Sequence, residues 1–338
     1  MNFLEKAWID KAGWLILLWP LSLLFQILTG LRRKLVTNKS STGDVPVVVI
    51  GNISLGGTGK TPLLLALVQY YKKKGMRPGV ISRGYGGRAS SYPLTVDENT
   101  DVSQCGDEAL LIALNTECPV IVDPDRRSAL KTLLDHNSVD VVFSDDGLQH
   151  YRLRRDIEIA VVDGVRLFGN GWCLPAGPLR EPVQRLAEVD YIVVNGETSA
   201  AVPELSAAHS ITLAPTYLVN QVSGDKRPFS DAPFKMGNTI QAVAALGNPE
   251  RFFATLDKLP YPMRRFPFPD HHLFRPDDFT GHGIDEHQPI VMTEKDAIKC
   301  RNFAQDNFWV LKVDVTLPQA LLDALDKQLA ALLEQTKG

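Results

Sequence analysis

The sequence has few cysteines and no excess of basic residues. Its 338 residues include four cysteines, which lie far apart and form no C-x-x-C pair. This spacing argues against a zinc knuckle or a disulfide framework and indicates a reducing compartment. The formal net charge of −3 excludes a broad basic signature, so nucleic acid is a poor candidate partner. Internal repeats and long low-complexity tracts are also missing, and a 44% hydrophobic content is sufficient for a folded core.

A strand pattern followed by a glycine-rich loop is the strongest motif. The apolar run 47–50 leads into the loop SLGGTGKT at 54–61, after which a helical pattern begins. Backbone N–H groups of such a loop can surround nucleotide phosphates, with Lys60 at the outer phosphates and the Thr61 hydroxyl on magnesium. Ser54 stands where the general pattern G-x-x-x-x-G-K-[ST] has its first glycine. The residues expected to bind the nucleotide are Ser54, Gly56, Gly57, Thr58, Gly59, Lys60 and Thr61.

An uncharged segment precedes this loop. Residues 12–28 carry no charge, contain Pro20, and are followed by the basic cluster 32–34. Their number is at the short end of the roughly 17 to 25 residues of a spanning helix. Mixed charges before the segment argue against a signal peptide, so we expect a retained membrane anchor with its basic cluster on the cytoplasmic side. A helix in the membrane interface and a buried core helix are the alternatives.

Strand and helix patterns alternate after a polar linker at 37–44. This alternation predicts an α/β fold like that of P-loop nucleoside triphosphatases, with a mainly parallel sheet and helices on both faces. Patterns between 240 and 333 predict a smaller α/β unit, and the boundary is expected in the Ala-, Ser- and Pro-rich region 198–238. The expected domains are an anchor helix (1–35), a P-loop core (36–210) and a C-terminal α/β domain (211–338). The strands expected in the core are 47–50, 78–82, 119–122, 139–143, 157–162 and 191–194.

Two aspartates follow the expected strand 139–143. The second nucleotide motif of P-loop proteins ends a buried strand in an acid that holds magnesium directly or through water. We favour Asp145 for the metal and keep Asp146 as the alternative. Gln149 and His150, in the same DDGLQH turn, are expected to support phosphate or substrate.

A base is needed if the acceptor is an alcohol, because its hydroxyl must lose a proton. Asp107 opens a helical pattern, which places it near the carboxyl edge of the sheet. Acids in the first turn of a helix are more often structural, so Asp107 is a candidate through this chemical need. Downstream, Asp270 stands beside His271 and His272, and its carboxylate could fix a histidine tautomer.

Two arginine-bearing loops follow strands and therefore face the same edge of the sheet. Arg83 and Tyr85 lie in the loop 82–88, and Arg126 and Arg127 lie in the loop 123–127. Arginine pairs bidentately with phosphate, so these side chains would suit ATP or a phosphorylated substrate. A solvated surface arginine is the alternative for each.

With these motifs the chain closely resembles the tetraacyldisaccharide 4'-kinase family, the lipid A 4'-kinases. The matching signatures run in the family's order from 51 to 299: GNISLGGTGKTP, ISRGYGG, GDEALL, DPDRR, DDGLQH, LPAGPLREP, GNPERFF, FPDHH and TEKDAIK. The resemblance implies transfer of the ATP γ-phosphate to the 4'-hydroxyl of tetraacyldisaccharide 1-phosphate, forming lipid IVA. It also implies Mg²⁺ as cofactor and a location on the cytoplasmic face of the inner membrane of a Gram-negative-type bacterium. The partners it implies are the lipid disaccharide and the membrane, and the sequence indicates no protein partner.

The resemblance also implies roles for single residues. Lys60 and Thr61 correspond to the phosphate and magnesium ligands, and Asp145 corresponds to the metal acid. Asp107 corresponds to the base, and His271 would hydrogen-bond it and tune its pKa, with His272 adjacent as the alternative. The residue implied in the metal shell or the substrate site is Glu181.

Two other functions are compatible with a P-loop. A membrane-tethered nucleotide switch or transport ATPase needs the same motifs, and the stretch 293–296, TEKD, is similar to the guanine motif [NT]-K-x-D. Its lysine directly precedes the aspartate, so that motif is not matched. The second alternative is a soluble small-molecule kinase or ligase whose N-terminal helix is buried.

Overall fold

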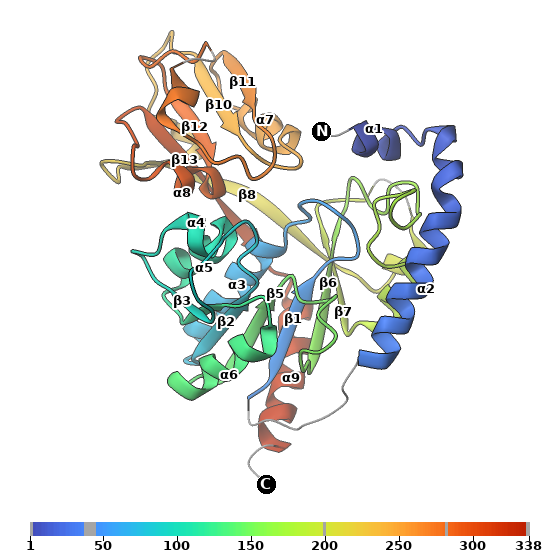
Figure 1. The fold of residues 1–338 in the computed structure, drawn as a ribbon. Helices are drawn as coiled ribbons and strands as arrows, with labels where there is room; N and C mark the ends of the chain where they lie inside the picture. Colours follow the sequence, from blue (N-terminus) through green and yellow to red (C-terminus); the bar gives the residue numbers. More distant parts are fainter. Residues whose placement is uncertain (1–2, 37–44, 199–200, 281–282, 336–338) are drawn as a thin grey trace.

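Two lobes share one continuous β-sheet (Figure 1). The computed structural model describes residues 3–36, 45–198, 201–280 and 283–335, and the predicted polar linker at 37–44 lies outside them. The strands in these ranges are β1 (Val47–Gly51), β2 (Pro78–Ser82), β3 (Leu94–Val96), β4 (Val120–Val122), β5 (Val141–Asp145), β6 (Ile157–Asp163), β7 (Tyr191–Asn195), β8 (His209–Asn220), β9 (Lys226–Pro228), β10 (Ile240–Ala244), β11 (Met263–Pro267), β12 (Ile290–Thr293) and β13 (Phe308–Thr316). Their order is β11-β10-β12-β13-β8-β7-β6-β1-β5-β2-β4-β3, and β9 pairs with β8.

Helices cover both faces of this sheet. The α-helices of the described residues are α1 (Phe3–Ile9), α2 (Trp19–Val36), α3 (Lys60–Lys73), α4 (Val102–Cys105), α5 (Asp107–Thr116), α6 (Arg126–His136), α7 (Glu250–Leu256), α8 (Glu294–Cys300) and α9 (Gln319–Gln335). The 3-10 helices are η1 (Gly13–Leu18), η2 (Val183–Glu188), η3 (Pro203–Leu205), η4 (Phe229–Asp231) and η5 (Pro276–Phe279).

The first lobe is built around β1, whose five residues are all buried. Strands β7, β6, β1, β5, β2 and β4 run parallel, and the short strand β3 pairs antiparallel with β4 at the edge. Side chains alternate between faces: Val48 and Ile50 join the apolar cluster of α3, α5 and α9, whereas Val47 and Val49 join that of α6. A strand buried on both faces has the continuous apolar pattern seen in the sequence. The predicted mainly parallel α/β fold is confirmed.

The second lobe repeats this layering on a smaller scale. Strands β11, β10, β12 and β13 run parallel, with α7 on one face and α8 on the other. Strand β8 joins the lobes, because it pairs parallel with β7 and antiparallel with β13. Helix α9 then returns to the first lobe, where Leu321, Leu325 and Leu329 are buried beside α3. The division into three domains stays a prediction, and the C-terminal helix packs with the core of the first lobe.

The apolar N-terminal segment forms two helices. The sequence predicts one helix over 12–28, but the structure has η1 followed by α2, which continues to Val36. Pro20 lies in the first turn of α2, where its missing N–H is not needed. The segment Gly13–Val36 is long and apolar enough to cross a membrane, and only 11% of its most apolar window is buried. That exposure does not fit the alternative of a buried core helix.

Helix α2 lies along the first lobe (Figure 1). Ser22 is fully buried; its hydroxyl donates to the Cys173 carbonyl at 2.8 Å and accepts from the Ala176 N–H at 3.0 Å. Arg33 pairs with Glu188 at the end of η2. One side of α2 is therefore held by the lobe, while most of its leucines are exposed on the other side.

Candidate functional site

The P-loop between β1 and α3 opens on a large cavity. Gly59 adopts φ +96°, and a Cβ there would lie 2.3 Å from Nδ2 of Asn195, which donates to the Thr58 carbonyl at 3.1 Å. A side chain at this position would displace that support, so the turn requires glycine. A Cβ on Gly57 would meet nothing within 4 Å, which leaves the middle of the loop open to a ligand.

The cavity lies between the lobes and has a volume of about 1840 Å³. It reaches from the P-loop to residues of the N-terminal helices, including Trp8, Phe25 and Arg32. Most side chains predicted for the site line it. They are Ser54, Gly56, Gly57, Thr58, Gly59, Lys60, Thr61, Arg83, Tyr85, Arg126, Asp145, Asp146, Gln149, His150 and His271.

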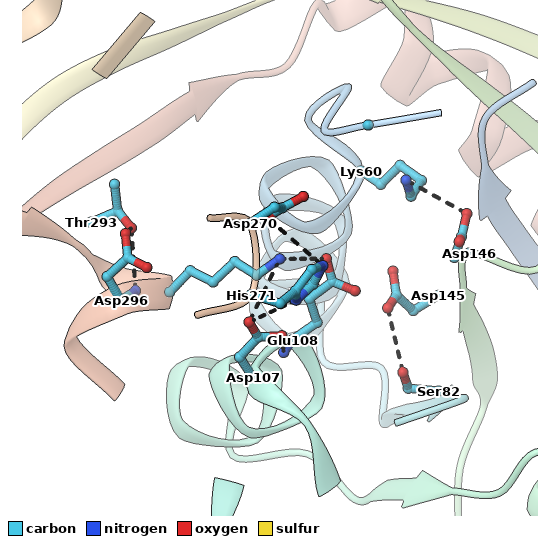
Figure 2. Close-up of polar contacts among 12 residues, drawn as sticks. Lys60, Ser82, Asp107, Glu108, Asp145, Asp146, Asp270, His271, Thr293 and Asp296 are labelled. Atoms are coloured by element: carbon cyan, nitrogen blue, oxygen red, sulfur yellow. Dashed lines mark hydrogen bonds and ion pairs between the residues drawn. The ribbon is translucent and has the colours of Figure 1, made fainter. Parts of the chain in front are cut away.

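The two aspartates after β5 occupy different environments (Figure 2). Asp145 accepts a hydrogen bond from Ser82 Oγ at 3.4 Å, and its buried Oδ1 has no hydrogen-bond partner among the described residues. Asp146 adopts φ 46° and lies 3.5 Å from Lys60 Nζ and 3.0 Å from Arg180. A left-handed backbone at a non-glycine residue is typical of strained functional positions.

The two environments shift the pKa values of the two aspartates in opposite directions. Burial, together with the nearby charges of Glu108 and Asp146, raises the pKa of Asp145 well above its usual range. Burial would also raise the pKa of Asp146, but Lys60 and Arg180 outweigh it and lower the pKa to about 2. Asp146 is therefore already compensated by cations, whereas the Asp145 carboxylate would gain most from a bound cation.

The candidate base and a histidine meet across the lobes. Asp107 begins α5 and is only 5% exposed, and its Oδ2 lies 3.1 Å from His271 Nδ1 (Figure 2). The predicted contact is confirmed, and His272 instead pairs with Asp278 at 2.9 Å. Burial would raise the pKa of Asp107, but the His271 hydrogen bond and the charge of Lys295 outweigh it and lower the pKa below its usual value. A buried carboxylate is thus kept ionised beside the cavity.

Comparison with known proteins decides the family. The model of the family described as tetraacyldisaccharide-1-P 4'-kinase matches residues 14–330. The chain belongs to this family. A tetraacyldisaccharide 4'-kinase of Hahella chejuensis is 44% identical over 99% of this chain and 98% of that protein. One from Aeromonas hydrophila is 45% identical over 97% of this chain and 96% of its own length.

A solved 4'-kinase structure has the same fold. The crystal structure of LpxK from Aquifex aeolicus in complex with ATP superimposes with a TM-score of 0.74 at 27% identity. The superposition covers 93% of this chain and 99% of that one. Both lobes and the P-loop are therefore arranged as in a protein of this family that binds ATP.

Of the remaining predicted residues, Tyr85 and Arg126 line the cavity of this 4'-kinase family member, whereas Glu181 and Arg127 do not. Tyr85 packs against His271 in a tilted arrangement, with ring centroids 4.8 Å apart. Glu181 is buried behind Gln149, whose Nε2 donates to its Oε1 at 2.6 Å. Arg127 is 56% exposed and pairs with Asp125, so we leave it out of the site. Its neighbour Arg126 is buried and donates to the Asp145 carbonyl at 2.9 Å.

The electrostatics around His150 disfavour its charged form. Burial, followed by the charges of Arg126 and Arg83, lowers the pKa of His150 to about 4. His150 is therefore neutral near pH 7 and can donate or accept a single hydrogen bond at each ring nitrogen.

Three further side chains that line the cavity were not predicted from the sequence. Arg180 forms an ion pair with Asp146 at 3.0 Å, and Asn195 donates a hydrogen bond to the P-loop at the Thr58 carbonyl. Lys295 Nζ lies 3.7 Å from Asp107. Arg180 is part of the LPAGPLREP signature, and Asn195 directly follows the expected strand 191–194. Their places in the sequence could be recognised, but their contacts could not. Lys295 belongs to TEKDAIK, where its charge next to a distant acid could not be anticipated.

Proposed function

We propose that the chain transfers the γ-phosphate of ATP to the 4'-hydroxyl of tetraacyldisaccharide 1-phosphate and forms lipid IVA in lipid A biosynthesis. One observation carries this function: in a member of the 4'-kinase family, the P-loop and His271 line a single cavity, and the buried Asp107 lies directly behind His271. A nucleotide switch needs no such base, because it transfers the phosphate to water. ADP release that depends on the lipid acceptor tests this choice, since a switch releases ADP without it.

The P-loop residues hold the nucleotide. The open backbone at Gly57 receives the phosphates, and Lys60 leaves its pairing with Asp146 to follow the γ-phosphate. Arg83 and Arg126 reach the same cavity and offer charge to ATP or to the substrate's phosphate.

The donor set fits Mg²⁺. In the described residues no group of three His, Cys, Asp or Glu side chains gathers as a complete metal site. Magnesium instead prefers one or two protein oxygens together with water and phosphates, and Thr61 and the unpartnered Oδ1 of Asp145 supply such oxygens. When bound, the ion would neutralise charge on the phosphates. Glu181 supports this arrangement from behind through Gln149.

Asp107 accepts the proton of the acceptor hydroxyl. His271 fixes the orientation of the carboxylate from the second lobe, and the tilted ring contact with Tyr85 holds the imidazole in place. The buried position of Asp107 limits competition from water. The base therefore acts only when the lobes are together.

Substitution of the two aspartates separates metal binding from charge pairing. Asp145→Asn is expected to raise the Mg²⁺ concentration for half-maximal turnover by at least about tenfold, because a cation ligand is lost. Asp146→Asn is the matched control and should change this concentration much less, since its carboxylate already pairs with Lys60 and Arg180. A magnesium titration of ADP release measures both. The reverse order would assign the metal to Asp146.

The outward side of α2 suits a lipid surface. Its large side chains Leu21, Leu24, Leu28 and Leu35 are 54%, 52%, 56% and 84% exposed. Arg32 and Lys34 follow at the end of the helix, where anionic lipid would attract them. We propose that this side attaches the chain to the cytoplasmic face of the inner membrane, so that the lipid disaccharide enters the cavity beside α2.

Removal of the apolar side should release the chain from membranes. Deleting residues 1–33 is expected to move the protein to the soluble fraction while ATP binding, which depends on residues from 51 onward, persists. The triple change Leu21→Gln, Leu24→Gln and Leu28→Gln keeps the Ser22 contacts and should do the same. Fractionation without detergent and nucleotide binding are the measurements. Membrane retention of the folded triple variant would contradict the proposal.

A further inference from the structure

Among the described residues, the basic side chains that pair with Asp107 come from the second lobe. Its Oδ2 lies 3.1 Å from His271 Nδ1, 3.7 Å from Lys295 Nζ and 4.0 Å from Lys299 Nζ. His271 follows β11 and both lysines lie on α8, whereas Asp107 starts α5 of the first lobe. A carboxylate that is 5% exposed therefore has these three cationic side chains across the contact between the lobes, in addition to the hydrogen bond that its Oδ1 accepts from the Glu108 N–H at 2.9 Å.

Lys295 bridges two adjacent acids. Its Nζ donates to Glu108 Oε1 at 3.1 Å while remaining 3.7 Å from Asp107. The lysine and Glu108 both line the cavity, and the lysine side chain is 17% exposed. Two neighbouring carboxylates repel each other, and a cation between them offsets this repulsion. The same ammonium thus touches the base and its neighbour.

Buried polar contacts support the helix turn that carries Lys295. Thr293 caps α8 and donates its hydroxyl to Asp296 Oδ2 at 2.8 Å (Figure 2). Asp296 has no exposed surface and also accepts from the Ala245 N–H at 3.2 Å. Lys299, four residues after Lys295, pairs with Asp296 at 2.8 Å and lies 5.2 Å from the centre of the Phe274 ring. The start of α8 is therefore fixed, which distinguishes Lys295 from a mobile surface lysine.

We propose that Lys295 is a positioning residue for phosphoryl transfer, whose ammonium holds the carboxylates of Asp107 and Glu108 in place across the lobe contact. The inference rests on the proposed role of Asp107 as the base. Separation of the lobes would remove His271, Lys295 and Lys299 from Asp107 together. Asp107 would therefore act as the base only while the two lobes are in contact.

The expected pH dependence follows from the charges around the base. Replacing Lys295 with glutamine removes one positive charge between two carboxylates, so Asp107 holds its proton more tightly and ionises at higher pH. The other ionisable groups that face this centre stay unchanged. They are Cys105 on α4, Glu108 on α5, Asp145 after the strand part of β5, Asp270 and His271 after β11, and Asp296 and Lys299 on α8.

The test is the pH profile of kcat/KM for the lipid acceptor, measured on the full chain. Lys295→Gln is expected to move the acid limb to higher pH by about one pH unit, with little change in the KM for ATP. Lys295→Arg keeps the positive charge, so its acid limb should lie at the same pH as that of the unmodified chain. The matched control is Lys258→Gln, an exposed lysine after α7, which should leave the profile unchanged. Glu108→Gln removes the neighbouring negative charge and should move the limb in the opposite direction.

Two results would overturn the inference. One is a lower rate in Lys295→Gln with an unmoved acid limb, since that indicates a contact that only joins the lobes. The other is a profile identical to that of the unmodified chain. If Lys295→Gln does not fold, as judged by ATP binding, Lys295→Met decides the question, because it keeps the unbranched apolar stem and removes the charge. Asp107→Asn separates the two proposals: wild-type turnover in that variant refutes the base itself, whereas its inactivity beside a silent Lys295→Gln refutes only the role of Lys295.

Discussion

Asp107→Asn is expected to lower turnover by about 10²- to 10⁴-fold, the usual contribution of a positioned general base, with little change in ATP affinity. The amide keeps the shape of the carboxylate and removes its basicity. Asp107 contacts His271 and Lys295 rather than the P-loop, so nucleotide binding should be spared. Steady-state turnover and an independent measurement of ATP binding check both parts.

The partner His271 should act with Asp107 as a unit. His271→Ala is expected to lower turnover by a similar factor, and the double variant should lose much less than the product of the single losses. The matched control is His272→Ala, because His272 contacts Asp278 instead of the base. If Asp107→Asn weakens ATP or magnesium binding and leaves turnover intact, Asp107 is a metal ligand, and Asp146 becomes the next candidate base.

Lys60→Ala is expected to reduce phosphoryl transfer by about 10³-fold or more, because the transition state spreads charge over oxygens that this ammonium stabilises. Lys60 is the first residue of α3, and its side chain points into the cavity, with Asp146 at 3.5 Å. The fold should therefore survive the change. Lys131→Ala, at an exposed lysine of α6, is the matched control.

Thermal unfolding and turnover of the two lysine variants separate the outcomes. A folded Lys60→Ala protein with turnover close to that of Lys131→Ala would contradict the P-loop assignment. A folded but inactive protein that still binds the lipid acceptor agrees with it.

Local sequence patterns were sufficient to predict the P-loop and most of the first lobe. The strand 47–50, the glycines and Lys60-Thr61 are contiguous, and the structure places them as β1, a loop and α3. Buried parallel strands are continuous apolar runs, so the predicted strand 78–82 coincides with β2. Strand β8 was missed because its burial alternates irregularly and its sequence contains alanine and proline.

Contacts between distant residues were not readable from spacing. His271 and Asp107 are 164 positions apart, and their pairing was predicted through the family resemblance. Lys295 lies far from Glu108 in sequence, and only the packing of α8 against α5 brings them to 3.1 Å. Likewise, Arg180 reaches Asp146 through the fold of the loop after β6. Residue types and motifs predicted many of the side chains that line the cavity, and tertiary structure determines which of them touch.

Transfer of label from γ-labelled ATP to a tetraacylated disaccharide 1-phosphate tests the central claim most directly. The purified chain with Mg²⁺, ATP and this acceptor in mixed micelles should yield labelled lipid in proportion to the ADP released, and Asp107→Asn should lower both by about 10²- to 10⁴-fold. An acceptor whose 4'-hydroxyl is replaced by hydrogen should remain unlabelled. Release of labelled inorganic phosphate without labelled lipid would contradict the account and would favour a nucleotide switch.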